Sequence, residues 1–311
     1  MILFCGIPTE TPLAMAIAAA EAADVRHVVF NQREAHFADL LVEYRDGQWG
    51  GSLWTQETAW PLEDFTGVYT RLLDHGSLPE NQLHGSRMPD AQAVARSGFL
   101  HGILAEWIEL AQCRVLNKAE AMASNGSKPY QAQWIQRAGF LTPPTLVTND
   151  PALALDFARQ QGRVIYKSTS SIRSIVREFD PNRPVDLKRL RSLPTQFQAR
   201  IVGTNIRVHV IGEKLFATEI LSKAVDYRYA QRDGLEVEMQ PVELPAEVAT
   251  RCVQLSKMLR LPFCGIDLMR TSGGEYYCFE VNPSPAYSYF EQEAGQPISR
   301  AVVDYLSNSA S

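Results

Sequence analysis

Two acidic residues and one amide near the end of the chain have the spacing of metal ligands. Glu280 and Asn282 lie in the apolar stretch YYCFEVNPSP, and Asp267 lies in the preceding stretch FCGIDLMR. A carboxylate in an apolar strand costs free energy unless it is paired or binds a metal. Alternation points Glu280 and Asn282 to one face, and a turn at TSGGE brings Asp267 back near Glu280. These oxygens suit Mg²⁺ or Mn²⁺, but a structural carboxylate pair on a wet sheet face fits the spacing equally well.

Two lysines lie where a phosphate could be bound. Lys167 ends the strand-like segment VIYK, where it is either a phosphate ligand or an edge lysine that extends into water. Lys128 begins a predicted helix capped by Ser127, so its charge opposes the helix dipole. Such local conflicts are often found at functional sites. The loop STSSIRS adds hydroxyls and Arg173, which by themselves are a weak signal.

The first third of the chain predicts an α/β unit. ILFCGI and VRHVVF are apolar strands on either side of an Ala-rich helix, and GVYTRLL is a further strand. The segment LLVEYRDGQWGGSLWT predicts two alternating strands around Asp46-Gly47 and Gly50-Gly51, which is a hairpin signal. Arg71 ends a predicted strand, where α/β sheets bind ligands, but a solvated strand-end arginine is the more common case.

The remaining two thirds predict strands with a few helices. RVIYKS, QFQARI and the two halves of IRVHVIGEKLFATEIL have the pattern of strands, and REF is expected to pair with RVIYKS. The segment AEVATRCVQLSKMLRL is an amphipathic helix, and FCGIDLMRTSGGEYYCFEVN is a hairpin around Gly273-Gly274. His209 shares a strand face with Arg207, and we expect it to be a packed, hydrogen-bonded histidine.

These segments resemble the ATP-grasp superfamily of carboxylate ligases, in particular the ribosomal-protein glutamate ligases and the ligases that macrocyclise ribosomal peptides. The resemblance is carried by SKPYQAQWIQRAGFLTPPT, VIYKSTSSIRSIV, QFQARIVGTNIRVHVIG, DYRYA and GIDLMR…CFEVNPSP. It implies an α/β (α+β) ATP-grasp fold. The expected parts are an N-terminal Rossmann-like (pre-ATP-grasp) domain at 1–112, a small central lid at 113–196, and a C-terminal mixed-sheet domain with the metal site at 197–311.

The resemblance also implies a role for each matching residue. Lys128 and Lys167 correspond to the lysines that hold the nucleotide phosphates, and the backbone of Gln198, Ala199 and Ile201 to the segment that meets adenine. Asn205 stands where an acidic residue often holds the ribose. The expected catalytic residues are Arg228 near the transferred phosphoryl group, Arg207, and Arg173 as a phosphate clamp. The expected magnesium ligands are Asp267, Glu280 and Asn282.

The chain departs from the family pattern at several of these positions. The loop after Lys167 lacks the usual glycines, and Ala199-Arg200 replace the usual pair of a glutamate and an aromatic residue. Asn205 replaces an acid, which weakens the expected ribose contact.

The implied function is an ATP- and Mg²⁺-dependent ligase. It would activate a carboxylate as an acylphosphate and join it to an amine, or to a hydroxyl or thiol, on a peptide or an amino acid. A binding protein that keeps the nucleotide site without catalysis is the alternative, although loss of catalysis would usually be accompanied by loss of the metal ligands. Joining two molecules and cross-linking one peptide both remain open, as does a homo-oligomer.

Composition restricts the partners and the compartment. The net charge is −5 and there is no basic run, so neither nucleic acid nor a membrane surface is an expected partner. The five cysteines are scattered, which favours a reducing compartment. The apolar start of the chain has no basic residue before it, so we expect a cytoplasmic protein without a signal peptide.

Overall fold

The N-terminal unit contains a parallel sheet with the strand order β2-β1-β6-β7. The computed structural model describes residues 1–82, 90–168, 176–182, 187, 189–222 and 237–308. The sheet and its two long helices are β1 (Ile2–Gly6), α1 (Thr11–Ala22), β2 (His27–Asn31), β6 (Gly67–Thr70), α2 (Ala91–Leu110) and β7 (Arg114–Leu116). Asp90 caps α2 by accepting hydrogen bonds from the backbone of Gln92 and Ala93. The predicted Rossmann-like arrangement is confirmed.

A small antiparallel sheet is inserted between β2 and β6. It consists of β3 (Asp39–Arg45), β4 (Gln48–Thr55) and β5 (Thr58–Pro61). The predicted hairpin turn is present: Asp46 and Gly47 have φ angles of 51° and 83°, as a two-residue hairpin turn requires. Gly51 lies where a Cβ atom would approach Leu41 O to 2.0 Å, so the strand needs glycine at this position.

The central sheet has the order β10-β9-β11-β8, and helix α5 packs on one of its faces. Its elements are β8 (Thr145–Thr148), α5 (Pro151–Gln161), β9 (Val164–Ser168), β10 (Arg177–Glu178) and β11 (Thr195–Ala199). Val164 and Phe197 pack with Ala154 and Ala158 of α5 in one core. The strand residues that alternate with these, including Lys167, therefore face away from α5. The predicted pairing of REF with RVIYKS is confirmed by Arg177 and Glu178, which pair with Tyr166 and Ile165.

The C-terminal sheet has five strands in the order β14-β13-β12-β15-β16. Its strands are β12 (Thr204–Ile211), β13 (Lys214–Ser222), β14 (Val237–Pro241), β15 (Phe263–Arg270) and β16 (Tyr276–Asn282). We expected a mixed sheet, but each of these strands pairs antiparallel to its neighbour. Short turns join β12 to β13 and β15 to β16, as antiparallel pairing allows. One sheet face packs on α4 (Lys128–Arg137) and α7 (Ala246–Met258), so only the other face can present polar side chains to a ligand.

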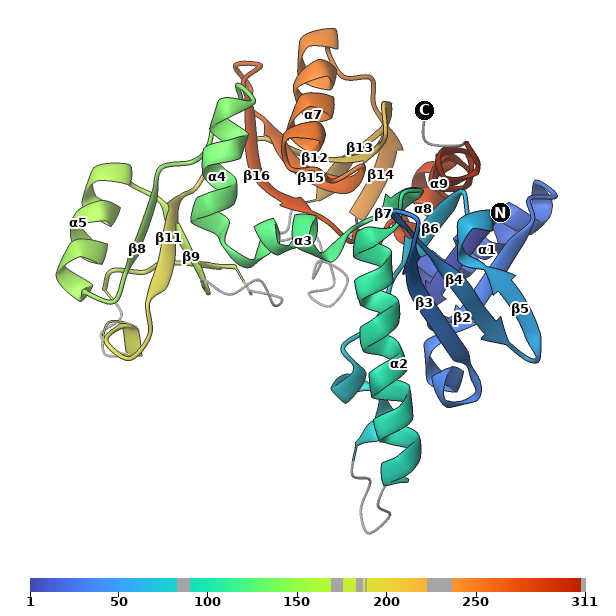
Figure 1. Cartoon of the computed structure of the whole chain (residues 1–311). Coiled ribbons are helices and arrows are strands. Elements are labelled where there is room, and N and C mark those ends of the chain that lie inside the picture. The colour runs from blue at the N-terminus through green and yellow to red at the C-terminus, as the bar shows by residue number, and fades with distance from the viewer. Residues whose placement is uncertain (83–89, 169–175, 183–186, 188, 223–236, 309–311) are drawn as a thin grey trace.

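The last two helices return to the N-terminal unit. These are α8 (Ser288–Ala294) and α9 (Ile298–Ser307), which the sequence analysis did not predict. Helix α9 packs against α1, β1 and β6, and Figure 1 shows α8 and α9, in red, beside the blue N-terminal unit. Val302 and Leu306 of α9 share one core with Ile2 and Phe4. The N-terminal unit is thus completed by the end of the chain.

The unit boundaries follow from which sheet each strand joins. β7 lies after the expected boundary at residue 112 but pairs with β6, and β11 spans the expected boundary at residue 196 but pairs with β8 and β9. Helix α4 was assigned to the central lid, yet it packs on the C-terminal sheet. We therefore propose that the lid comprises residues 145–199.

We expect Leu306→Ala to lower the free energy of unfolding by about 2–5 kcal/mol. Leu306 is fully buried, and its backbone and Cβ lie against Gly67. Because the backbones of α9 and β6 are already in contact here, little can move to fill the cavity that the substitution would leave. Denaturant unfolding would measure the change. Leu41→Ala is the control, because Leu41 is 46% exposed and its truncation should lower the free energy of unfolding far less. Equal losses for the two variants would contradict the packing of α9.

Candidate active site

The hairpin of β15 and β16 brings the three predicted metal ligands together. Asp267 pairs directly with Glu280, and Gly265 pairs with Asn282. The register shifts between Asp267 and Leu268, which pairs with Cys278, so Phe279 is an extra residue in β16. Val281 is buried in the helix-covered core, while Glu280 and Asn282 are only partly buried. The expectation that Asp267 lies beside Glu280 is therefore confirmed.

Two cations neutralise these carboxylates from different elements. Arg207 Nη1 donates to Asp267 Oδ1 at 2.6 Å, and Lys128 Nζ lies 3.1 Å from Glu280 Oε2. Arg207 is the cross-strand partner of Asp267, which settles that its side chain faces the site. Gly265 makes room for it, because a Cβ atom there would lie 2.3 Å from Arg207 Nη2. Each carboxylate could therefore exchange its cation for a metal ion, and each cation could then bind a phosphate oxygen.

Helix α4 holds the strand that carries Glu280. Ser127 caps the helix by accepting from Tyr130 N, as predicted, and so places Lys128 in the first turn. One turn later, Gln131 Nε2 donates to Val281 O at 2.7 Å and Gln131 Oε1 accepts from Val281 N at 2.8 Å. The Gln131 amide thereby replaces a neighbouring strand at the edge of the sheet, between two predicted metal ligands. Gln131 was not among the predicted site residues, although it follows Lys128 at the helical spacing of three.

Asn117 joins the two ends of the hairpin. Its side-chain oxygen accepts from Phe263 N at 3.1 Å, and its amide nitrogen donates at 2.5 Å to both Phe263 O and Pro283 O. Asn117 is 3% exposed, so these bonds are shielded from water. The start of β15 and the end of β16 are thus fixed to the segment that follows β7.

The central sheet presents Lys167 on the face turned away from α5. Lys167 is 6% exposed, and its cross-strand partner Gln196 and the next residue on that face, Gln198, are each 4% exposed. Gln198 Nε2 donates to Thr145 Oγ1 at 3.1 Å. A solvated edge lysine is excluded by this burial, and a buried face with a lysine and two amides is suited to a polar ligand.

The residues expected near the nucleoside lie on the connection between the central and C-terminal sheets. Gln198 and Ala199 end β11, Ile201 lies in the link, and Asn205 follows at the start of β12. Ala199 N donates to Pro144 O at 2.9 Å, so this N–H is already used within the central unit. Arg173 and Arg228 lie outside the described residues.

His209 is packed as expected but is not hydrogen-bonded. It is fully buried, its ring meets Phe290 edge-on at a centroid distance of 5.0 Å, and neither ring nitrogen has a partner among the described residues. Burial, with a smaller contribution from the nearby Arg207 charge, holds the pKa of His209 well below its ordinary value. The ring is therefore a neutral packing group.

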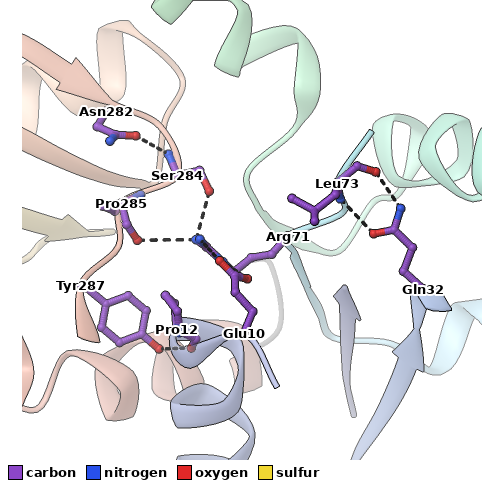
Figure 2. Close-up of polar contacts among 9 residues, drawn as sticks. All are labelled: Glu10, Pro12, Gln32, Arg71, Leu73, Asn282, Ser284, Pro285 and Tyr287. Carbon is purple, nitrogen blue, oxygen red and sulfur yellow. Dashed lines mark hydrogen bonds and ion pairs between the residues drawn. The ribbon is translucent and has the colours of Figure 1, made fainter. Parts of the chain in front are cut away.

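Arg71 is buried rather than solvated, which corrects the sequence-based interpretation. Its side chain is 10% exposed and donates to both carboxylate oxygens of Glu10, at 2.7 Å and 2.5 Å (Figure 2). Burial acts to lower the pKa of Arg71, but the Glu10 hydrogen bonds help to raise it above the ordinary value. Arg71 Nη1 also donates to Ser284 Oγ at 3.0 Å, two residues beyond Asn282.

Four of the five cysteines are buried and are poor candidates for a nucleophile. Cys5, Cys252, Cys264 and Cys278 are buried, and burial raises the pKa of each thiol, that of Cys264 to about 12. A thiol with a raised pKa carries little thiolate at neutral pH. Any covalent chemistry at this site therefore depends on substrates rather than on cysteine.

Comparison with known proteins decides the fold. An ATP-grasp ligase of Chryseobacterium gregarium, associated with a ribosomally synthesised peptide and bound to ADP, a leader and a core peptide, superposes with a TM-score of 0.79. It is 23% identical, and the match covers 98% of this chain and 96% of the other. The chain has the ATP-grasp fold. A family model described as a RimK-like ATP-grasp domain matches residues 164–306, so the resemblance inferred from sequence is confirmed.

Two further known proteins are similar to this chain. The ATP-grasp ligase PsnB, complexed with a variant of its minimal precursor, Mg and ADP, has a TM-score of 0.77 and 23% identity, with 98% and 97% of the two chains covered. A probable alpha-L-glutamate ligase of Teredinibacter turnerae is 23% identical over 250 residues, which cover 75% of this chain and 82% of the relative. No helix in the described part of this ATP-grasp chain is long and apolar enough to cross a bilayer.

We expect Gln131→Leu to lower the free energy of unfolding by about 1–3 kcal/mol, because it leaves the buried N–H and C=O of Val281 without partners. Denaturant unfolding would measure the loss. Gln133→Leu is the matched control, since Gln133 is exposed on the same helix and should change stability little. A Gln131→Leu variant as stable as the control would show that the amide does not hold β16.

We expect the stability of the protein to fall as the pH is lowered through about 6.5, the ordinary pKa of histidine. The lowered pKa of His209 means that the unfolded chain takes up a proton which the folded protein excludes, so acid favours unfolding. The variant His209→Leu should lose part of this dependence. Free energies of unfolding at several pH values would test it, and identical pH profiles for both proteins would contradict the burial of a neutral ring.

Proposed function

We propose that this ATP-grasp protein is an ADP-forming ligase that activates a carboxylate as an acylphosphate and joins it to an amine, or to a hydroxyl or thiol. The observation that carries the proposal is the pair of acidic residues, Asp267 and Glu280, matched in register and each held by a cation from another element. The cations Arg207 and Lys128 offset the repulsion between the two carboxylates, and the same positive charges could bind the phosphate oxygens of a nucleotide.

The donor set fits Mg²⁺ or Mn²⁺. Asp267, Glu280 and Asn282 offer only oxygen atoms, on one face of a hairpin, and two carboxylates with one amide leave coordination positions for water and phosphate oxygens. Asn282 Oδ1 accepts from Ser284 N at 3.0 Å, and a carbonyl oxygen retains a second lone pair for a metal. When bound, the ion would neutralise the charge of the ATP phosphates.

The residues of the chain would act by position and charge. Phosphoryl transfer needs little covalent chemistry from the protein, so Lys128, Lys167 and Arg207 need only hold negative charge in place. The substrate carboxylate would take the γ-phosphoryl group, and the amine would then displace phosphate. We also propose Arg173 and Arg228 as further cationic residues of the site, and Gln198, Ala199, Ile201 and Asn205 as nucleoside contacts, on the resemblance.

The substrate class is proposed as a peptide or an amino acid. Two of the relatives named above are bound to peptides in their structures, and a third is named a probable glutamate ligase. We propose a cytoplasmic setting, which the free thiols support, whereas a homo-oligomer remains a prediction.

We expect Asp267→Asn and Glu280→Gln to lower Mg²⁺-dependent ADP production by at least about 100-fold, the scale of losing one electrostatic group in a catalytic site. Coupled ADP detection with candidate peptide and amino acid acceptors would measure it. Glu219→Gln is the control, because Glu219 is a carboxylate of the same sheet that is more deeply buried than Asp267 or Glu280 and is paired with Arg270 on the opposite face.

Full turnover by either site variant would overturn the metal assignment. ATP binding by the wild-type protein without ADP formation, across carboxylate and amine substrates, would instead support the non-catalytic alternative.

A further inference from the structure

The loop that follows the metal-binding strand lies against the N-terminal unit. Residues 283–285 come directly after Asn282, and Figure 2 shows Ser284 and Pro285 beside Arg71 and Glu10. Glu10 precedes α1 and Arg71 follows β6, so both lie at the carboxyl ends of parallel strands. In open α/β sheets this edge is where ligands are bound.

A continuous series of hydrogen bonds joins the two units here. Glu10 takes two bonds from Arg71, Arg71 Nη1 donates to Ser284 Oγ at 3.0 Å, and Ser284 N donates to Asn282 Oδ1 at 3.0 Å (Figure 2). Arg71 Nη1 also lies 3.5 Å from Pro285 O. Each hydrogen bond in this series therefore restricts the position of the next residue, from Glu10 through Arg71 and Ser284 to Asn282.

Glu10 gives Arg71 one defined orientation. A guanidinium group is planar, so a carboxylate that accepts from both Nε and Nη2 fixes the direction of Nη1. Arg71 N also donates to Cys5 O at 2.8 Å, which fixes its backbone to β1. The direction of Nη1 then determines where Ser284 Oγ can lie.

We infer that Arg71, held by Glu10, is a positioning residue that orients the metal ligand Asn282 through Ser284. The inference rests on the proposed function, because Asn282 is a metal ligand only under that proposal. It assigns to the N-terminal unit a part in building the metal site of the C-terminal unit. Groups that orient metal ligands typically change metal affinity by about 10–100-fold when they are removed.

The test is a titration with Mn²⁺ in the presence of a nonhydrolysable ATP analogue, in which the electron paramagnetic resonance signal reports free Mn²⁺. We expect Arg71→Gln to raise the Mn²⁺ dissociation constant about tenfold. Ser284→Ala should also raise the Mn²⁺ dissociation constant, while the Arg71–Glu10 pair stays intact. Ser284→Ala keeps the inference testable if Arg71→Gln fails to fold.

Gln32→Leu is the matched control. Gln32 Nε2 donates to Leu73 O at 2.6 Å and Gln32 Oε1 accepts from Leu73 N at 2.9 Å, so Gln32 anchors the same segment two residues after Arg71 (Figure 2). It is 2% exposed, and its loss should lower the melting temperature without changing the Mn²⁺ dissociation constant.

The outcomes separate this inference from the proposed function. Unchanged Mn²⁺ dissociation constants in Ser284→Ala and Arg71→Gln, with a wild-type protein that binds Mn²⁺, would overturn the positioning role and leave the ligase proposal standing. A wild-type protein that binds no Mn²⁺ with the nucleotide analogue would overturn both.

Discussion

The site depends on the pairing of two neighbouring carboxylates with cations. Asp267 and Glu280 lie opposite each other on adjacent strands, where two like charges would repel. Arg207 from β12 and Lys128 from α4 offset this repulsion, so the hairpin is tied to a neighbouring strand and to a helix. The same positive charges are available to phosphate oxygens, which is why one arrangement serves both the folded chain and the proposed chemistry.

Much of the fold could be predicted because its signals are local. The turn at TSGGE brings Asp267 close to Glu280, although the extra residue Phe279 is needed to set the two directly opposite each other. Ser127 caps the helix that carries Lys128. The unit boundaries were less predictable, because the pattern of a strand does not reveal which sheet it joins. Helix α9 was missed although Ile298, Val302 and Leu306 recur at helical spacing, so its signal was present and unused.

The remaining errors concern contacts between residues that are distant in the sequence. Arg71 contacts Glu10, 61 residues away, and Ser284, 213 residues away, and no local pattern encodes either contact. Alternation placed His209 on the correct strand face. Its neighbour Phe290, however, comes from a distant helix and offers no hydrogen-bond partner, and neither ring nitrogen has one among the described residues. Gln131 and Asn117 were missed for the same reason, since each binds the backbone of a distant strand.

The most direct measurement is a crystal structure of the protein with Mn²⁺ and a nonhydrolysable ATP analogue, with anomalous scattering to locate the ion. The account predicts a Mn²⁺ peak about 2.0–2.2 Å from oxygens of Asp267, Glu280 and Asn282, with phosphate oxygens completing its coordination. It also predicts Lys128 and Lys167 beside the phosphates. A bound nucleotide whose Mn²⁺ lies away from these three side chains would contradict the account.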